Sequence, residues 1–359
     1  MYDSQNFSLE AWMSIRLPAE WEQQSAVLII WPHKDTDWAP YLERVTATYL
    51  EIAKAILTRQ KLVVCFHDKN LKKSTLNLFA ENNISITNLI CFIAPNNDTW
   101  ARDSGPITVL NKQRPILLDF IFNAWGGKFE SNLDDKITSI FTTKTLANRE
   151  DIETKQINMI LEGGSIESDG RGTLLTTSQC LLTDTRNAYM TRNDIEDQLF
   201  QHFNLKRILW LEHGYLIGDD TDSHIDTLAR LCPNNSIAYS TCNDEQDPHF
   251  EELSKMETEL KQLSSIEGNA YNLVPLPIPK SIYSEVGTRL PATYANFLII
   301  NDAVLLPIYG DSEADKFAIK QLESIFSDRE IIPINCCSLI EEHGSLHCIT
   351  MQLPQGVIN

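Results

Sequence analysis

Cys348 lies in the stretch EEHGSLHCITMQLP, where it follows a histidine and begins a short apolar run. A cysteine in such a run usually packs as a small hydrophobic side chain. The His-Gly-Ser-Leu-His segment before it suggests instead a tight polar turn that delivers the thiol to one chosen point. Only the thiolate is a nucleophile, so the groups that surround Cys348 decide between the two interpretations.

Three further segments place charged or reactive groups beside apolar runs. NNDTWARDSGP carries Trp100, Arg102 and Asp103, and ILEGGS carries Glu162 at the entry to a Gly-Gly turn. The third segment, GDDTDSHID, holds four acids and one histidine within eight residues: Asp219, Asp220, Asp222, His224 and Asp226.

Together these residue types fit attack on the carbon of a guanidinium group. A histidine near a thiol is the usual means of stabilising the thiolate. Carboxylates only accept hydrogen bonds, and a pair of them suits a planar, forked cation. The acids would hold the N–H groups, the thiolate would attack, and the histidine would protonate the departing nitrogen as ammonia.

Each residue also has a structural explanation. An isolated His-x-Asp is most often a hydrogen-bonded pair at a strand end, and Glu162 can be an ordinary turn residue. Cys348 can be an inert core thiol. For Arg102 we expect a structural ion pair with Asp103 beside a buried tryptophan. The acidic run at 219–222 lacks EF-hand spacing, so a calcium loop is not expected.

The elements that position these residues alternate between strand and helix patterns. SAVLIIWP (25–32) precedes a helical pattern at 41–57 and the strand KLVVCF (61–66). The pattern recurs in 85–121, 172–211, 236–263 and 296–335. Within the last range, Ser312 and Asp315 have the spacing of a capping box at the start of a helix. About five passes through one strand-helix-strand module predict an internally repeated α/β protein.

No Gly/Ser/Pro-rich linker divides these modules, so we predict a single domain over residues 1–359. Residues 1–12 show no clear periodicity and are expected to form a poorly ordered extension. The N-terminus lacks a basic start followed by an apolar stretch, so a secretory signal is not expected. No apolar run reaches the roughly eighteen residues of a membrane span.

Charge and cysteine content narrow the function classes. The net charge is −19 with a pI near 4.8, which disfavours nucleic acid and anionic membranes as partners and attracts cations. The eight cysteines include no C-x-x-C pair, a pattern typical of reduced thiols in the cytoplasm. Neither a disulfide framework nor a structural zinc site is therefore expected.

In combination, five segments resemble the agmatine deiminase family in their order and spacing: WARDSGP, EGGSIESDGRGTLLTT, GDDTDSHID, YANFLIINDAVLLPIYGD and HCITMQ. The resemblance runs from LPAEWEQQSAVLIIWPH onward and covers nearly the whole chain. It implies the pentein fold of guanidine-modifying enzymes, a five-bladed pseudo-symmetric α/β propeller of repeated strand-helix-strand modules. The sequence pattern alone leaves open whether the ring closes.

The resemblance implies a hydrolase acting on a linear amidine. It would convert agmatine to N-carbamoylputrescine and ammonia, in putrescine biosynthesis, without a metal or other cofactor. Cys348 would be the nucleophile and would carry a covalent amidino-thioether. His224 would be the general acid and base, and Glu162 would orient it or share its proton.

Four more residues would bind the substrate. Asp103 and Asp226 would grip the guanidinium, and Trp100 would wall the pocket beside the flat cation. Asp220 would meet the distal amine of agmatine. The expected partner is this small cation and neither nucleic acid nor membrane. Whether the chain forms a homodimer stays open.

One segment departs from the family pattern. Many members have Gly-Gly-Gly-Asn before Ile-His-Cys, whereas this chain has His343-Gly344-Ser345-Leu346 before His347. We expect altered kinetics or loop packing rather than lost chemistry, because His-Cys-Ile-Thr is intact.

Several rival functions share these residues. They are deimination of arginine or of peptidyl-arginine, amidino transfer to an amine, non-catalytic binding of polyamines or guanidines, and a zinc site built from His224, His347 and Cys348. An acidic far end of the pocket would repel the α-carboxylate of free arginine, and a pure binder has no use for a thiolate.

Overall fold

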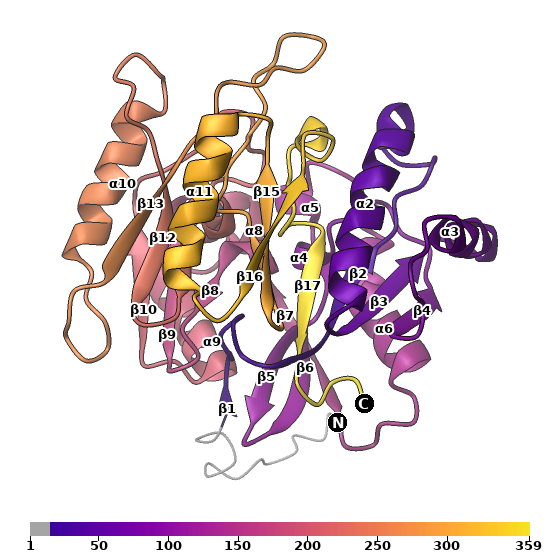
Figure 1. The fold of residues 1–359 in the computed structure, drawn as a ribbon. Coiled ribbons are helices and arrows are strands. Elements are labelled where there is room, and N and C mark those ends of the chain that lie inside the picture. The colour runs from indigo at the N-terminus through magenta and orange to yellow at the C-terminus, as the bar shows by residue number, and fades with distance from the viewer. Residues whose placement is uncertain (1–14) are drawn as a thin grey trace.

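The computed structural model describes residues 15–359, and the strands of this range form five separate sheets (Figure 1). In every sheet a central strand has an antiparallel neighbour on one side and a parallel neighbour on the other. Helical segments connect the parallel pairs, as the alternating pattern predicts. The extension expected at 1–12 lies outside the described residues.

The strands, in their spatial order within each sheet, are as follows. The first sheet holds β1 (Ile15–Arg16), β5 (Ile107–Asn111), β6 (Arg114–Ile121) and β7 (Glu153–Ile160). The second holds β10 (Arg207–Leu211), β9 (Thr173–Thr177) and β8 (Glu167–Ser168). The third holds β11 (Ala229–Cys232), β12 (Ser236–Thr241) and β13 (Asn272–Pro277). The fourth holds β14 (Leu298–Ile300), β15 (Ala303–Ile308) and β16 (Glu330–Asn335). The fifth holds β17 (Thr350–Pro354), β2 (Gln24–Ile30), β3 (Lys61–Phe66) and β4 (Leu89–Ile93).

The helices lie between these strands along the chain. The longer ones are α2 (Leu42–Leu57), α3 (Lys69–Glu81), α6 (Ile137–Thr145), α9 (Arg192–Phe203), α10 (Phe250–Gln262) and α11 (Ser312–Ile325). The short ones are α4 (Ala101–Ser104), α5 (Ala124–Gly127), α7 (Ser178–Leu181) and α8 (Asp184–Asn187). Single 3₁₀ turns are η1 (Ala39–Tyr41), η2 (Asp134–Lys136), η3 (Gly163–Ser165), η4 (Ile225–Thr227) and η5 (Ile340–Glu342).

Strand β2 shows why its sequence is apolar without alternation. Val27 and Ile29 belong to one hydrophobic core cluster, whereas Ala26, Leu28 and Ile30 belong to another. Successive side chains point to opposite faces of a sheet, so both faces of β2 are buried. A continuous apolar run is the pattern that such a strand requires.

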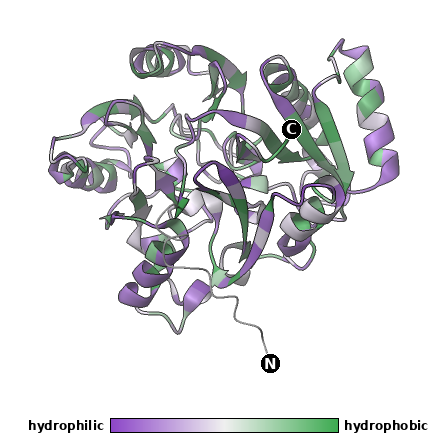
Figure 2. Ribbon diagram, turned by 90° about the horizontal axis from the view of Figure 1, so that it is seen from below, coloured by the Kyte–Doolittle hydropathy of each residue, from purple (hydrophilic) through white to green (hydrophobic). Residues whose placement is uncertain are grey.

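The helices connect each sheet to a neighbouring one. α2 packs on β3 of its own sheet and on β16 of the fourth, while α11 packs on β16 and on β13 of the third. In the same way α10 packs on β12 and on β10 of the second sheet. The view from below shows the helices toward the periphery, with purple segments facing outward and green strands nearer the middle (Figure 2).

Strands near the two ends of the described chain pair with each other in the fifth sheet. β17 pairs antiparallel with β2, with Thr350 opposite Ile29 and Met351 opposite Leu28. Figure 1 shows the yellow β17 beside the indigo β2. Residue 348 is therefore fixed just before a strand that is buried on both sides of its sheet.

A cluster of charged side chains with almost no solvent exposure joins segments from several sheets. It contains three basic residues and three acidic ones: Arg102, Arg230, His347, Glu20, Glu167 and Asp226. Arg230 bonds Glu167 and lies 3.1 Å from Glu20 Oε2 through Nη2. His347 lies 2.7 Å from Glu20 Oε2 through Nε2 and 2.7 Å from Asp226 Oδ2 through Nδ1.

His347 joins acids from two distant segments of the chain. Each of its ring nitrogens faces a carboxylate oxygen at hydrogen-bond distance, and its Nε2 also lies 3.1 Å from Arg230 Nη2. Burial alone would raise the pKa of Glu20, but His347 and Arg230 hold that pKa well below its usual range. The acids of the cluster are therefore compensated by the basic side chains beside them.

The structure corrects several expectations of detail. The run 296–310 is a hairpin of β14 and β15, and α3 was not expected. Asp311 rather than Ser312 precedes α11, and the Asp315 side chain accepts hydrogen bonds from the Tyr294 hydroxyl and the Tyr309 backbone, so the capping box was wrong. Arg102 is buried and structural, but its charged partner is Glu20, at 3.7 Å, and not Asp103.

The structure also bears on the thiols and on membrane spans. All eight cysteines are free. Among the described residues, none of the helices combines the length and apolar character needed to cross a bilayer.

Arg230→Met tests the buried charge cluster. The change leaves Glu20 and Glu167 with unbalanced charge in the interior, and we expect the free energy of unfolding to fall by about 3–5 kcal/mol. Urea unfolding monitored by circular dichroism measures the loss. Arg171→Met is the matched control, because Arg171 pairs with Glu267 at the exposed surface. Equal small losses in both variants would contradict the proposed importance of the cluster.

Candidate active site

A pocket opens beside Cys348, with about 590 Å³ of space that includes its opening to solvent. Its lining comes from segments far apart in the sequence, and none of the described residues that line it is a lysine or an arginine. The lining residues are Asp37, Asp98, Trp100, Asp103, Trp125, Phe129, Asp220, Thr221, Glu342, His343, Gly344 and Cys348.

Cys348 lies between η5 and β17 and is 5% exposed. Its Sγ lies 3.4 Å from Asn296 Oδ1 and 4.0 Å from Asp226 Oδ2. The Asn296 amide oxygen also accepts the His347 backbone N–H at 2.9 Å, and so fixes the turn before the thiol. Burial raises the pKa of Cys348 well above its ordinary value, and the charges of Asp226 and Asp103 raise it further.

Three polar side chains converge on the face of Gly164. A Cβ built on Gly164 would lie 2.6 Å from His224 Nδ1, 3.0 Å from Asp103 Oδ1 and 3.1 Å from Asp226 Oδ2. A side chain at 164 would occupy the space in which these groups meet. The second glycine of the EGGS segment is therefore required by the site and not by a turn alone.

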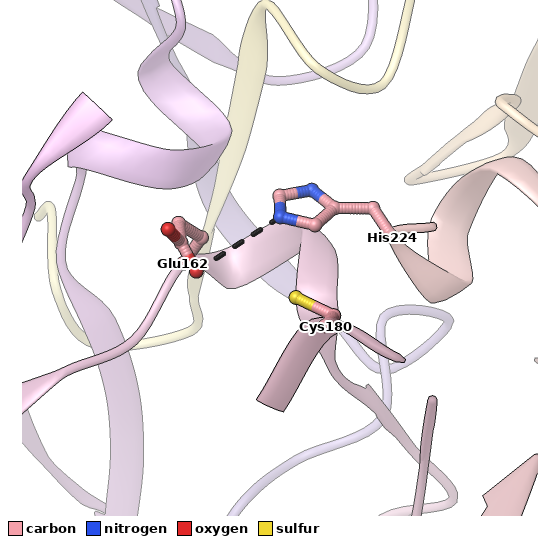
Figure 3. A group of neighbouring side chains, drawn as sticks. All are labelled: Glu162, Cys180 and His224. Carbon is pink, nitrogen blue, oxygen red and sulfur yellow. Dashed lines mark ion pairs between the residues drawn. The ribbon is translucent and has the colours of Figure 1, made fainter. Parts of the chain in front are cut away.

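His224 is 1% exposed, and neither of its ring nitrogens has a hydrogen-bond partner in the described structure. Its Nδ1 lies 3.8 Å from Asp103 Oδ1, and its Nε2 lies 3.9 Å from Glu162 Oε2 (Figure 3). Burial lowers the pKa of His224 to about 3, and the charge of Asp226 opposes this decrease only in part. The imidazole is therefore neutral at pH 7.

Arg186 holds Glu162 in place. Its Nε donates to both carboxylate oxygens, at 2.9 and 3.0 Å, and its Nη1 donates to Asp222 Oδ2 at 2.7 Å. Burial raises the pKa of Glu162, and Arg186 limits that rise. The loop that carries His224 and the strand end that carries Glu162 are thus tied to one guanidinium.

The two carboxylates Asp103 and Asp226 differ in their partners. Asp103 accepts the Gly164 backbone N–H at 2.9 Å and the Trp125 indole N–H at 3.0 Å. Burial and two neighbouring acids raise its pKa well above the ordinary value. Burial would also raise the pKa of Asp226, but the hydrogen bond from His347 lowers it overall. Asp226 Oδ1 has no partner in the described structure.

Aromatic rings form one wall of the pocket. Trp100 and Trp125 meet edge to face with 6.1 Å between ring centroids, and Trp100 donates to Asp98 Oδ2 at 2.8 Å. A Cβ on Gly344 would lie 2.1 Å from the Trp100 ring. The loop before Cys348 therefore lies flat on this indole, and the glycine that this chain keeps at 344 allows the contact.

The far end of the pocket is acidic. Burial, followed by the charge of Asp219, raises the pKa of Asp220 to about 6. Burial and nearby acids raise the pKa of Glu342 to about 7. Between them lies His343, whose backbone has φ of +66° and whose Nδ1 donates to the Gly218 carbonyl at 2.7 Å. The left-handed conformation is one that glycine adopts freely.

The seven residues predicted for the site lie in or beside the pocket, although the sequence places them far apart. Trp100, Asp103, Asp220 and Cys348 line it. Asp226 lies next to the lining residue Cys348 and His224 next to the lining residue Asp103. Glu162 lies behind His224, with 3.9 Å between Oε2 and Nε2.

Sequence reasoning missed four residues that shape the site: Trp125, Cys180, Arg186 and Asn296. Asn296 is fully buried and interrupts the apolar stretch YANFLII, a signal that could have indicated a polar role. The backbone of Trp125 has a φ of +55°, and no pattern in the sequence predicts this conformation. Arg186 and Cys180 stand in ordinary polar and apolar surroundings and gave no signal.

The set His224, His347 and Cys348 does not form a metal site among the described residues. Both ring nitrogens of His347 face carboxylates of the buried charge cluster. The donor groups that do approach one another are Glu162 with Cys180 and His224, and Glu20 with Glu167 and His347.

Chemically, the site combines a buried thiol, an unbonded neutral imidazole and two inward carboxylates next to an aromatic wall. Carboxylate oxygens accept hydrogen bonds from several directions, and no lining lysine or arginine neutralises them. The arrangement fits a flat cation with several N–H groups whose central carbon faces a sulfur nucleophile.

Comparisons with known proteins were made for the whole chain. A family model described as Porphyromonas-type peptidyl-arginine deiminase matches residues 16–354. Agmatine deiminase of Medicago truncatula is 28% identical over 365 residues, which cover 94% of this chain and 96% of that protein.

Solved structures agree with these matches. A Cys-to-Ser variant of agmatine deiminase from C. jejuni with substrate bound is 39% identical, with a TM-score of 0.87, and the match covers 96% of this chain and 97% of that chain. Agmatine deiminase of Enterococcus faecalis is 28% identical, with a TM-score of 0.83 and the same coverage.

Gly164→Ala tests the convergence of the polar groups. The added methyl would displace the His224 ring or the Asp103 carboxylate, and a shift of about 1 Å in such a site costs about 100-fold in rate. We expect kcat/KM for the guanidinium substrate to fall by this factor while the far-ultraviolet circular dichroism spectrum is kept. Gly268→Ala is the control, because a Cβ there meets no atom within 4 Å. An unchanged kcat/KM in Gly164→Ala would contradict the site geometry.

Proposed function

The chain belongs to the family of agmatine deiminases and Porphyromonas-type peptidyl-arginine deiminases, and we propose that it hydrolyses agmatine to N-carbamoylputrescine and ammonia. One observation carries the proposal: the Cys348 thiol faces a pocket free of lysine and arginine, beside Asp226, Asp103 and the unbonded His224. The C. jejuni relative with bound substrate is a Cys-to-Ser variant, which supports a cysteine nucleophile.

In the first half of the reaction, Asp103 and Asp226 hold the guanidinium N–H groups and His224 takes the thiol proton. The Cys348 sulfur attacks the guanidinium carbon and forms a C–S bond. The imidazolium of His224 then returns the proton to one terminal nitrogen, and that C–N bond breaks to release ammonia. An amidino-thioether remains on Cys348. Proton transfer of this kind contributes about 10²–10⁴ in rate.

In the second half, water attacks the same carbon while His224 removes its proton. The C–S bond breaks, the thiol of Cys348 is restored with the proton held by His224, and the ureido product leaves. Splitting one difficult displacement into two easier steps is the general gain of covalent catalysis. Glu162, 3.9 Å from His224 and bound to Arg186, stabilises the imidazolium that forms twice in the cycle.

The protonation states of Cys348 and His224 favour this order of steps. Burial and the anions around it keep Cys348 a thiol, and burial keeps His224 neutral. A guanidinium between Asp103 and Asp226 introduces a positive charge beside the sulfur. That charge stabilises the thiolate, because an opposite charge within a few ångströms favours the ionised form. The substrate thereby activates its own nucleophile.

The far end of the pocket sets the substrate preference. Asp220 lies there with Glu342, and the described lining offers no lysine or arginine to meet the α-carboxylate of arginine. Agmatine carries an amine at this position, and Asp220 accepts its hydrogen bonds. Deimination of free arginine is thereby disfavoured. Trp100 lies along the planar guanidinium of agmatine.

We also propose that the five sheets form a closed, five-bladed, pseudo-symmetric propeller within one domain spanning the chain. Helix contacts between successive sheets support this, as does the contact of α8 with β7, which joins the second sheet to the first. α6 contacts β4 and so joins the first sheet to the fifth.

Eight free cysteines support a cytoplasmic setting, where the product would serve putrescine biosynthesis.

Cys348→Ala tests the nucleophile. Removing the sulfur removes the covalent route, so we expect ammonia release from agmatine to fall by at least about 10⁴-fold with an unchanged circular dichroism spectrum. A haloacetamidine should label one thiol rapidly in the parent chain and none rapidly in this variant. Cys337→Ala is the control, because Cys337 is a partly exposed thiol away from the pocket. Uniformly slow alkylation of all eight cysteines would favour a non-catalytic binder.

Asp220→Asn tests recognition of the distal amine. Loss of a hydrogen bond to a charged group should raise KM for agmatine by about tenfold or more and change kcat less. Because the pKa of Asp220 is raised to about 6, the carboxyl is neutral below that pH. We therefore expect kcat/KM to rise as pH increases through about 6, and this rise to disappear in the variant.

The exposed Asp328→Asn supplies the control for the change in net charge. Agmatine, arginine and a peptide ending in arginine should be compared in each protein. Asp220→Asn with unchanged KM for agmatine would place the amine elsewhere, and preference of the parent chain for the peptide would indicate a peptidyl-arginine deiminase.

A further inference from the structure

A second cysteine lies directly behind the proposed acid–base pair. The donor atoms of Glu162, Cys180 and His224 all lie within 4.8 Å of one another, and all three side chains are buried. Figure 3 shows the Cys180 sulfur directed toward the other two side chains, which extend from separate segments. Cys180 takes no part in the reaction proposed above.

The position of Cys180 is fixed by the loop that carries the histidine. Thr177 precedes α7 as its N-cap, and its Oγ1 accepts the Cys180 backbone N–H at 3.3 Å. The same hydroxyl donates to the Ser223 carbonyl at 2.8 Å, one residue before His224. One threonine therefore holds both donors in their relative positions.

The three donors have capacity for a metal ion. Both nitrogens of His224 lack partners, although the side chain is 1% exposed. Glu162 is held by Arg186 from one side, and each of its oxygens keeps a further lone pair. Thiolate, imidazole and carboxylate are the ligands of tetrahedral zinc sites, and three protein ligands leave one position for water.

The second group of donors in the described residues gives a contrast. Glu20, Glu167 and His347 are equally close to one another. There Arg230 lies between the carboxylates and bonds both, and both nitrogens of His347 face carboxylates. In the first cluster the guanidinium of Arg186 bonds only Glu162 of the three donor residues, and both nitrogens of the His224 imidazole are unengaged in the described structure.

We propose that Glu162, Cys180 and His224 form a binding site for Zn²⁺ that inhibits the enzyme. On binding, the Cys180 thiol loses its proton to solvent and a zinc–sulfur bond forms, while His224 and Glu162 each donate one lone pair. No oxidant or reductant is required. Zinc then holds the imidazole lone pair that would accept the proton of Cys348, so that the acid–base step stops. Only this inhibition rests on the proposed function, and the binding itself does not.

Cobalt(II) reports the binding directly, because a thiolate ligand gives a charge-transfer absorption band that weaker ligands lack. We expect the band in the parent chain, in Cys348→Ser and in Cys91→Ser, and its disappearance when Zn²⁺ is added. It should be absent in Cys180→Ser. A parent chain without the band would overturn the proposal, as would a band that is lost in Cys348→Ser.

The second measurement is the Zn²⁺ concentration that halves ammonia release, with each variant normalised to its own metal-free rate. Removal of a ligand weakens metal sites by about tenfold or more, so this concentration should rise by at least that factor in Cys180→Ser. An equal concentration in Cys180→Ser and the parent chain would overturn inhibition at this site.

Cys180→Ala provides a second variant if serine proves unstable in so apolar a position, and its melting temperature checks folding. If the chain fails to release ammonia from agmatine, the proposed function fails, while the cobalt spectra still decide whether the metal site exists.

Discussion

The pairing of His347 with two buried carboxylates is the contact on which the rest of the molecule depends. It joins Glu20, before the first central strand, to Asp226, in the middle of the chain, through a residue that precedes the last strand. Arg230 and Arg102 complete the balance of charge. Buried ions of one sign are strongly destabilising without partners, so these segments must meet if the chain is to fold.

The same cluster positions the reactive groups through the chain itself. Cys348 follows His347 and Asp103 follows Arg102, while Asp226 belongs to both the cluster and the site. The buried cluster therefore fixes the backbone beside Cys348 and Asp103, and it fixes the side chain of Asp226 directly. The thiol thus stands among anions on a rigid support, and the charge that would favour its ionised form must come from a bound cation. A pocket built in this way is selective for cations before any direct contact with the amine is considered.

Much of this could be predicted from the sequence, and the reasons for the gaps are physical. Strong apolar periodicity indicated α2, β3, α9 and α10, because burial imposes it, and the order of short motifs indicated the residues of the site. The hairpin within 296–310 was missed because both of its strands are buried and only two polar residues, Asn301 and Asp302, separate them. Arg102 was recognised as structural, but its partner Glu20 is distant in the chain, and only the fold brings them together.

Residues that belong to no sequence motif were missed for the same reason, because only the fold brings them to the site. Asn296 fixes the turn before the thiol, and Arg186 fixes Glu162, yet each is a single polar residue without a characteristic spacing. The sequence shows that glycines before the nucleophile are replaced in this chain. It does not show that the loop packs against the Trp100 ring at the glycine that is kept, Gly344. A conformation such as that of His343, with φ of +66°, has no signature in one sequence.

The antiparallel pairing of β17 with β2 has a consequence for how the protein is made. A nascent chain emerges from its N-terminus at a pace of about 5–20 residues per second, so four of the five sheets can assemble while β2 still lacks its outer neighbour. The Cys348 sulfur is made only just before β17, after the strands of the other four sheets. A nascent chain that has not yet reached β17 can therefore assemble most of the acidic pocket, but it lacks the sulfur until β17 pairs with β2.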